Sequence, residues 1–265
     1  MEGSARPSFA NRLVAIAGSL RQLIGYPMTL FPAWQQLAAD LSGTAPGRCS
    51  VVTLSSNFRT ANHLVSLVFN GGTAPIMAVK IARSPDTENS EYSALARECR
   101  NLQALSKVSP ASAESVPAAL ELYSGEHGNW LAETALLGKV ISPRMVQRDH
   151  QRIVRIVTSW LTRLHSDTAH RINSTVEAEA FQRRMMTPLH DVGRHFAADH
   201  HLATMLSHTL ERTASVFQPG MLSVFEHGDL SHPNLLLADN NKLGVLDWEE
   251  ADPQGLPAVD LFFFL

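Results

Sequence analysis

The stretch EHGDLSHPNLL (226–236), followed by VLDWEE (245–250), carries the chain's densest group of chemically active side chains. Asp229 and Asn234 stand five residues apart, and Asp247 ends the next apolar run. Each side chain offers a hard oxygen atom, and such groups are costly to hold together beside an apolar core without a cation. Because short apolar runs flank the motif, we expect it on a small β-hairpin that brings the three side chains together.

Carboxylate and amide oxygens of this kind suit Mg²⁺, which also takes phosphate oxygens from a substrate. Asn234 and Asp247 are the better metal ligands, which leaves Asp229 to accept a proton from an attacking hydroxyl group. The pattern therefore indicates phosphoryl transfer. The alternative is that Asp229 and Asn234 only cap turns, as these residue types often do.

The first half of the chain has the pattern of a small antiparallel sheet that carries one helix. Asn70, Gly71 and Gly72 predict a hairpin turn, because Asn and Gly adopt positive φ at little cost. A helical stripe of leucines separates the early strands from the later ones. The predicted elements are strands at 51–54, 63–69 and 76–82, a helix at 90–105, and strands at 119–123 and 130–137.

The second half is mainly helical, with apolar stripes at helical spacing in 152–165 and 201–217. Short strands return only around the opening motif. The fold class we expect is α+β, with two lobes. The expected parts are an N-terminal helical extension at 1–47, whose role is open, a β-rich nucleotide-binding lobe at 48–138 and a helical lobe with the catalytic hairpin at 139–265.

HGDLSHPN followed by VLDWE resembles the signature of the aminoglycoside phosphotransferase and choline kinase family, whose members share a protein-kinase-like fold. The resemblance implies that Asp229 is the catalytic base and that Asn234 and Asp247 bind metal. It also implies that His227 fixes the loop through hydrogen bonds and that Asp260 supports the same loop. The likeness extends over about residues 51 to 260.

The first lobe offers a check on this resemblance, because a kinase-like lobe needs a strand lysine for the nucleotide phosphates and a helix glutamate that orients it. Lys80 stands in the strand run AVKIA (78–82). Glu98 stands on the following helix and is the preferred partner, with Glu91 as the rival. The alternative is that Lys80 is an edge-strand lysine whose head reaches solvent.

Two further segments match positions that contact the nucleotide in the family. The loop at 54–64 would cover the phosphates; it lacks glycine, but four of its side chains can donate hydrogen bonds. Residues 133–136 resemble the connector between lobes, where Glu133 and Ala135 would read the adenine edge. The hydrogen-bonding residues of the loop are Ser55, Ser56, Asn57 and Arg59.

Composition excludes several classes of function. The chain has 265 residues, 45% of them hydrophobic, and a formal net charge of −3 without a run of like charges, so neither a nucleic-acid surface nor a polybasic membrane anchor is expected. No run reaches the roughly 18 apolar residues that span a bilayer. Cys49 and Cys99 form no disulfide framework, so we expect a cytoplasmic protein. The His-rich stretch at 190–201 is interpreted as a solvated helix rather than a zinc site.

The sequence therefore predicts an ATP-dependent phosphotransferase, with Mg²⁺, that acts on a hydroxyl group of an aminoglycoside-, choline- or sugar-like acceptor. GTP in place of ATP, the acceptor's identity and the oligomeric state are left open. A nucleotide-binding pseudokinase or regulatory module without turnover is the alternative, and metal-dependent hydrolysis with water as acceptor is a third. Because the apolar run at 257–265 has the pattern of a helix that continues, we expect the chain to be truncated there.

Overall fold

The computed structural model describes residues 27–43, 49–54, 63–82, 93–109, 112, 114–125, 128–171, 182, 186–196, 200–216 and 222–264. The chain divides into two compact units. The first contains the described residues of Met1–Ala96 together with Ala119–Ala135, and the second contains those of Arg97–Ala118 together with Leu136–Leu265. The division at residues 47 and 138 that the sequence suggested stays a prediction.

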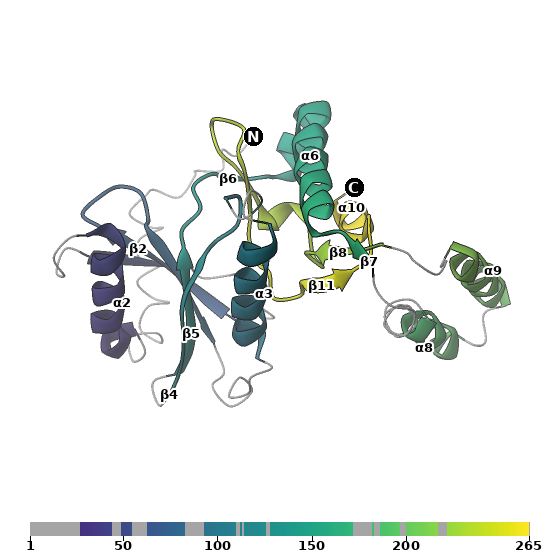
Figure 1. Ribbon diagram of the computed structural model, residues 1–265, viewed down its shortest axis with the longest axis horizontal. Helices are drawn as coiled ribbons and strands as arrows, with labels where there is room; N and C mark the ends of the chain where they lie inside the picture. The colour runs from purple at the N-terminus through teal and green to yellow at the C-terminus, as the bar shows by residue number, and fades with distance from the viewer. Residues whose placement is uncertain are drawn as a thin grey trace, which may run out of the picture. The chain divides into compact units, whose positions relative to one another are not determined.

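The first unit is built on a five-stranded sheet in the order β1-β2-β3-β5-β4, in which all neighbours are antiparallel (Figure 1). The central strand β3 is buried along its whole length, whereas residues of the edge strand β1 alternate between half-buried and exposed. This difference is expected, because both faces of a central strand can be covered. The strands are β1 (Cys49–Leu54), β2 (His63–Asn70), β3 (Met77–Ala82), β4 (Ala119–Gly125) and β5 (Gly128–Thr134).

The connection between β2 and β3 confirms the predicted hairpin, with a longer loop than a two-residue turn. The strands pair from Val68 with Met77 outward, and residues 71–76 form the connection. Gly71 has φ +72°, which a residue with a side chain rarely adopts. The residues Asn70 to Gly72 therefore predicted the position of the turn correctly, but they did not predict the length of the loop.

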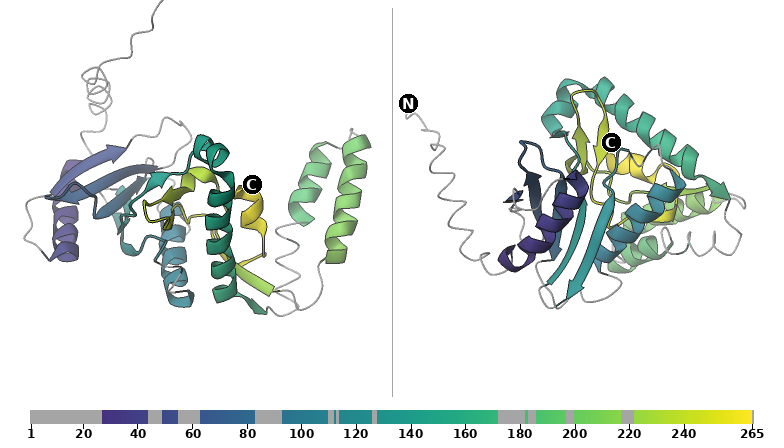
Figure 2. Two further views of the ribbon diagram at one scale, coloured as in Figure 1. Left: turned by 90° about the horizontal axis from the view of Figure 1, so that it is seen from above. Right: turned by 60° about the vertical axis from the view of Figure 1, so that its left-hand side comes forward.

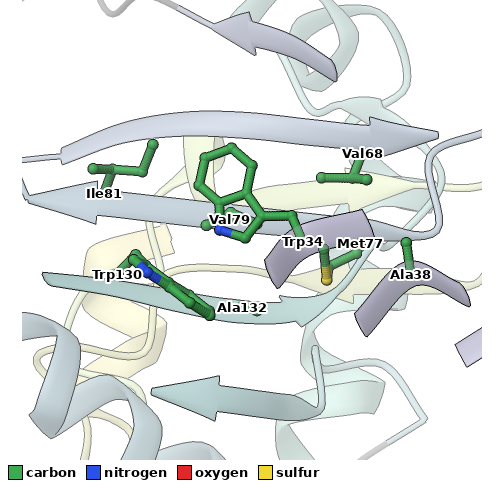
Figure 3. Packing of buried hydrophobic residues seen from close by; sticks show 8 residues of the cluster. All are labelled: Trp34, Ala38, Val68, Met77, Val79, Ile81, Trp130 and Ala132. Carbon is green, nitrogen blue, oxygen red and sulfur yellow. The ribbon is translucent and has the colours of Figure 1, made fainter. Parts of the chain in front are cut away.

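Helix α2 (Pro27–Ser42) packs on this sheet and supplies part of its core. The Trp34 ring meets the Trp130 ring edge-on at 6.3 Å, and both side chains are buried (Figure 3). Aromatic pairs in this geometry add to the stabilisation from apolar burial. Trp34 therefore belongs to the core of the first unit, whereas Leu41 of the same helix is 42% exposed. Residues 1–26 of the predicted N-terminal extension lie outside the described residues.

Helix α3 (Ala94–Val108) begins after Ser93, whose hydroxyl group accepts the backbone N–H of Ala96 at 3.1 Å. Such a bond satisfies one of the N–H groups that have no partner inside a helix. Leu95, Leu102 and Leu105 are buried, as the leucine stripe predicted. The helix therefore starts four residues later than expected.

The second unit combines helices with two small sheets, in the orders β10-β9-β6 and β11-β8-β7. Helix α6 buries Ile153, Val157, Trp160, Leu161 and Leu164, which confirms its predicted apolar stripe. The helices are α5 (Pro143–Arg148), α6 (His150–Thr168), α8 (Thr187–His195), α9 (His200–Val216) and α10 (Val259–Phe264). The strands are β6 (Lys139–Val140), β7 (His170–Arg171), β8 (Leu222–Glu226), β9 (Leu235–Leu237), β10 (Leu243–Val245) and β11 (Asp252–Gly255).

Helices α8 and α9 lie side by side (Figure 2) and bury little apolar surface. Leu206 is 8% exposed, but Met205, expected on the same buried stripe, is 52% exposed. The stripe prediction was therefore wrong for Met205, since burial depends on how many faces of a helix have a neighbour. The histidines of the stretch at 190–201 are exposed; they are His190, His195, His200 and His201.

The observed architecture confirms the predicted α+β class, with an antiparallel sheet and a helix followed by a mainly helical part. Among the helices within the described residues, none has both the length and the apolar character needed to cross a membrane.

Candidate active site

Strand β8 leads into the site, and its position is fixed from both sides. On one side, the Phe225 backbone N–H donates to the hydroxyl group of Thr168, at the end of α6, at 2.9 Å. On the other side, a Glu226 carboxylate oxygen accepts the N–H of Leu256 at 2.9 Å. These two bonds therefore fix the end of β8, after which the loop begins at His227.

Asp260 holds the beginning of this loop. Its carboxylate accepts the backbone N–H groups of His227 at 2.8 Å and Gly228 at 2.9 Å, and the side chain is fully buried. Gly228 has φ +84°, and a Cβ atom there would lie 2.3 Å from the carbonyl oxygen of Glu250. Only glycine fits this position. The support of the loop by Asp260, which the family resemblance implied, is confirmed.

The imidazole of His227 joins the two halves of the motif. Its Nε2 lies 2.9 Å from the carbonyl oxygen of Leu246, and its Nδ1 lies 3.2 Å from the backbone nitrogen of Asp229. Since a carbonyl accepts and an N–H donates, this network assigns the proton to Nε2 and leaves Nδ1 as the acceptor. The expected structural role of His227 is therefore confirmed.

Asp229 and Asn234 are in direct contact. The side-chain amide nitrogen of Asn234 donates to both the carbonyl oxygen and a carboxylate oxygen of Asp229, each at 3.0 Å. Asn234 is the last residue of a single 3₁₀ turn, η3 (His232–Asn234), which follows Asp229 in the loop. Both side chains are half-buried, so a ligand can reach them.

Asp247 reaches the same place through the hairpin of β9 and β10. The strands pair Val245 with Leu235, and the N–H of Leu246 then donates to the carbonyl oxygen of Asn234 at 2.8 Å. Asp247 follows at once, half-buried, with φ +68°. The backbones that carry Asn234 and Asp247 therefore lie next to each other, as the hairpin prediction required.

Glu98 is bound to the residue after Asp247. Its carboxylate accepts the backbone N–H of Trp248 at 3.1 Å, and the side chain is fully buried. The sequence connected Glu98 only with Lys80. The contact with Trp248 joins residues 150 positions apart and has no local signal in the sequence.

The remaining predicted site residues lie in the first unit or outside the described residues. Lys80, 7% exposed, stands in β3 between Val65 and Leu131 of the neighbouring strands. Its burial and central position exclude the alternative of an edge-strand lysine. Because Lys80 and Glu98 belong to different units, their pairing stays a prediction.

The predicted connector begins in β5. Glu133 is buried in that strand, and the N–H of Ala135 donates to the carbonyl oxygen of Ile76 at 3.2 Å. The first unit ends at Ala135. Contact of these residues with a nucleotide stays a prediction. Five predicted residues lie outside the described part of the chain: Ser55, Ser56, Asn57, Arg59 and Glu91.

Asn101 of α3 contacts the segment that follows Asp247, and the sequence analysis did not predict this contact. Its side-chain amide donates to the carbonyl oxygens of Trp248 at 2.8 Å and Ala251 at 3.1 Å. Polar residues are common on half-exposed helix faces, so the presence of an asparagine at position 101 does not indicate this contact. The glycine of His-Gly-Asp, by contrast, is a usable sign of a strained turn.

Comparison with known proteins places this geometry in a family. A model of the phosphotransferase enzyme family, abbreviated APH, matches residues 69–265. No curated protein matches the chain. The three solved structures described next are at most 22% identical to this chain, so each of them shows the fold alone.

The macrolide 2′-phosphotransferase MphH from Brachybacterium faecium is 22% identical, with a TM-score of 0.56; the match covers 87% of this chain and 76% of that protein. A thermostable mutant of aminoglycoside phosphotransferase APH(4)-Ia, solved with ADP and hygromycin B, is 12% identical, with a TM-score of 0.54 and coverage of 83% and 72%. APH(2″)-IIa, solved with streptomycin and ATP, is 16% identical, with a TM-score of 0.51 and coverage of 77% and 69%.

These matches confirm the predicted kinase-like α+β fold. Because the family model covers most of the residues, including the whole motif from His227 to Asp247, the chain belongs to the phosphotransferase enzyme family.

Proposed function

We propose that this protein transfers the γ-phosphoryl group of ATP to a hydroxyl group of a small molecule. One observation carries the proposal, namely that Asn234 joins the two halves of the motif. Its side-chain amide donates to the Asp229 carboxylate at 3.0 Å. Its backbone carbonyl oxygen accepts the N–H of Leu246, the residue before Asp247, at 2.8 Å. In this proposal, a proton acceptor and two hard oxygen ligands act together from backbone segments that these bonds join. Phosphoryl transfer depends mainly on such positioning and on charge neutralisation.

Asp229 is the catalytic base in this proposal. One of its carboxylate oxygens accepts the Asn234 amide, which orients the carboxylate. The other oxygen would accept the proton of an incoming hydroxyl group as the phosphoryl group transfers. The N–H of Asp229 is bound to His227, so the backbone beneath the carboxylate is also fixed.

The donor set at Asn234 and Asp247 fits Mg²⁺. Both hydrogens of the Asn234 amide group are used by Asp229, and no donor among the described residues bonds its oxygen Oδ1. That oxygen and the half-buried Asp247 carboxylate are two hard ligands, the number that a protein commonly supplies to a phosphate-bound Mg²⁺. When bound there, the ion would neutralise charge on the nucleotide phosphates.

Lys80 would hold the nucleotide phosphates from the first unit, oriented by Glu98, and the polar side chains of the loop at 54–64 would donate to the same phosphates. The connector at Glu133 and Ala135 would contact the nucleotide base. ATP is the preferred donor because it is present in the solved complex of APH(2″)-IIa, and ADP is present in that of APH(4)-Ia. GTP is the alternative donor.

The acceptor we propose is an aminoglycoside-, choline- or sugar-like molecule with a free hydroxyl group. The matching structures contain hygromycin B and streptomycin as ligands of those proteins. A cytoplasmic location, where ATP is available, fits this activity and the two free cysteines. A nucleotide-binding module without turnover is the second candidate, favoured by the absence of glycine from residues 54–64.

The test is transfer of labelled phosphate from ATP to a panel of aminoglycosides, macrolides, choline and sugars. Asp229→Asn should lower kcat by about 10²- to 10⁴-fold, because the general base is removed. Asp239→Asn is the matched control, since Asp239 lies in the β9–β10 turn with its side chain fully exposed. Nucleotide binding without transfer to any acceptor would favour the second candidate, and full activity of Asp229→Asn would contradict the assignment.

A further inference from the structure

The segment after Asp247 is attached to one face of helix α3. Residues 248–251 lie between β10 and β11 and have no strand partner. Their polar backbone groups need other partners, because a buried, unpaired carbonyl or N–H group is costly. Figure 1 shows α3 beside the segment that leads into β11.

Three side chains of α3 supply those partners. Glu98 accepts the N–H of Trp248 at 3.1 Å, and Arg97 donates to the carbonyl oxygen of Glu249 at 3.3 Å. Arg97 also pairs with the Glu250 carboxylate at 3.3 Å. Asn101, one turn further along the helix, completes the set, which we call the α3 clamp: Arg97, Glu98 and Asn101.

Asn101 makes the contact that spans the whole segment. The N–H of Ala251 bonds the carbonyl oxygen of Trp248 at 3.3 Å, so these residues form one tight turn. The Asn101 amide donates to the carbonyl oxygens at both ends of that turn, at 2.8 Å and 3.1 Å. One side chain therefore fixes the turn that immediately follows Asp247.

The side chain of Trp248 anchors the first residue of this segment. Its ring is fully buried, its Nε1–H donates to the carbonyl oxygen of Val245 at 3.0 Å, and its ring centre lies 4.6 Å from that of His227. On the other side of Asp247, Leu246 is bonded to both Asn234 and His227. Asp247, with φ +68°, is therefore held between two residues that cannot move freely.

We infer that Asn101 is a positioning residue that sets the direction of the Asp247 carboxylate, and that the α3 clamp adjusts the metal site from helix α3. The inference rests on the proposed role of Asp247 as a metal ligand. Asn101 touches neither the metal nor the substrate. It acts through the backbone of Trp248, to which the carboxylate-bearing residue is directly bonded.

The test compares Asn101→Asp and Asn101→Ala with the parent protein. Asn101→Asp keeps the shape of the side chain but replaces the donating amide nitrogen with a carboxylate oxygen. That oxygen is repelled by the carbonyl oxygens of Trp248 and Ala251. Gln103→Ala is the matched control, because Gln103 is an exposed amide on the same helix that bonds only Cys99 of its own helix. Should Asn101→Asp fail to fold, Asn101→Ala carries the test.

Three quantities are measured: hydrogen exchange of the amides in 246–251, Mn²⁺ binding in the presence of ADP, and the Mg²⁺ concentration for half-maximal transfer. Loss of two hydrogen bonds should raise the exchange rates, weaken Mn²⁺ binding and raise the Mg²⁺ requirement, each by about tenfold. The KM for the acceptor should stay unchanged while kcat falls. A merely structural contact would lower thermal stability and leave the metal requirement as it is.

The inference is overturned if Asn101→Ala and Gln103→Ala give the same exchange rates and the same Mn²⁺ affinity. A parent protein that binds no Mn²⁺ with ADP overturns the proposed function instead. In that case the exchange rates of 246–251 alone decide whether Asn101 holds the turn.

Discussion

The loop from His227 to Asp247 and the pair of helices α8 and α9 belong to the same unit but are stabilised in opposite ways. The loop is held by hydrogen bonds from side chains such as Asp260 and His227, both fully buried. In the helix pair, Met205 and Phe196 are about half exposed, and Leu206 is the buried apolar residue identified in α9. The loop is therefore held by buried hydrogen bonds, whereas the helix pair contributes little buried apolar surface.

This difference in stabilisation has a physical reason. Phosphoryl transfer needs a small number of oxygen atoms at fixed positions, which only a loop with satisfied polar groups can provide. Most of the described side chains of α8 and α9 are exposed, so this pair contributes little to the core and fixes no comparable set of polar groups.

The largest effect is expected from removing the buried carboxylate that holds the loop. Asp260→Ala leaves the N–H groups of His227 and Gly228 without their acceptor, so the free energy of unfolding should fall by about 3 kcal/mol. Chemical denaturation measures it. Asp239→Ala, at a fully exposed side chain, is the control and should have little effect. Equal stability of the two variants would show that the Asp260 carboxylate does not stabilise the start of the loop.

A somewhat smaller effect is expected at Gly228. Gly228→Ala combines φ +84° with a Cβ atom 2.3 Å from the Glu250 carbonyl oxygen, so it should destabilise by about 2 kcal/mol and displace Asp229. Transfer activity should fall further than stability does. Gly72→Ala is the control, since nothing lies within 4 Å of the added Cβ atom. An active Gly228→Ala protein would show that the loop is adaptable.

Acid should lower the free energy of unfolding through His165. Burial lowers the pKa of His165 on α6, the helix whose Thr168 bonds β8. The unfolded chain therefore binds the proton more readily, so stability is complete above the ordinary histidine pKa of about 6.5 and falls as pH drops below it. His165→Gln should flatten this dependence in denaturation curves recorded between pH 7 and pH 5. An unchanged slope would show that other groups control it.

The smallest effect is expected on the surface of α9. Met205→Ala should change the free energy of unfolding by less than about 0.5 kcal/mol, because the side chain is 52% exposed. Leu206→Ala, its buried neighbour, should cost more and serves as the comparison. An equal cost at Met205 and at Leu206 would show that exposure does not separate the two side chains.

Much of the fold could be predicted from local patterns, because the information lies in neighbouring residues. Alternation and turn residues predicted the hairpin of β2 and β3, and the stripe from Ile153 to Leu164 predicted α6. The same logic failed for Met205, since periodicity states which face is apolar but not whether another helix covers it.

Some residues at the candidate site could be predicted from the sequence and others could not. Asp229, Asn234 and Asp247 form a compact pattern that sequence alone could place on one hairpin. Asn101 could not be found, because its partners are backbone carbonyl oxygens in a segment about 150 residues away, and any sequence can supply those. Contacts between a side chain and a distant backbone depend on the tertiary fold and leave no residue pattern.

The central claim is that Asn234 and Asp247 hold one metal ion beside Asp229. Electron paramagnetic resonance of Mn²⁺ titrated into the protein with ADP tests it most directly. The account predicts one bound Mn²⁺ in the parent and in Asp229→Asn, and loss of that ion in Asp247→Ala and in Asn234→Ala. Parent-like Mn²⁺ binding by Asp247→Ala would contradict it.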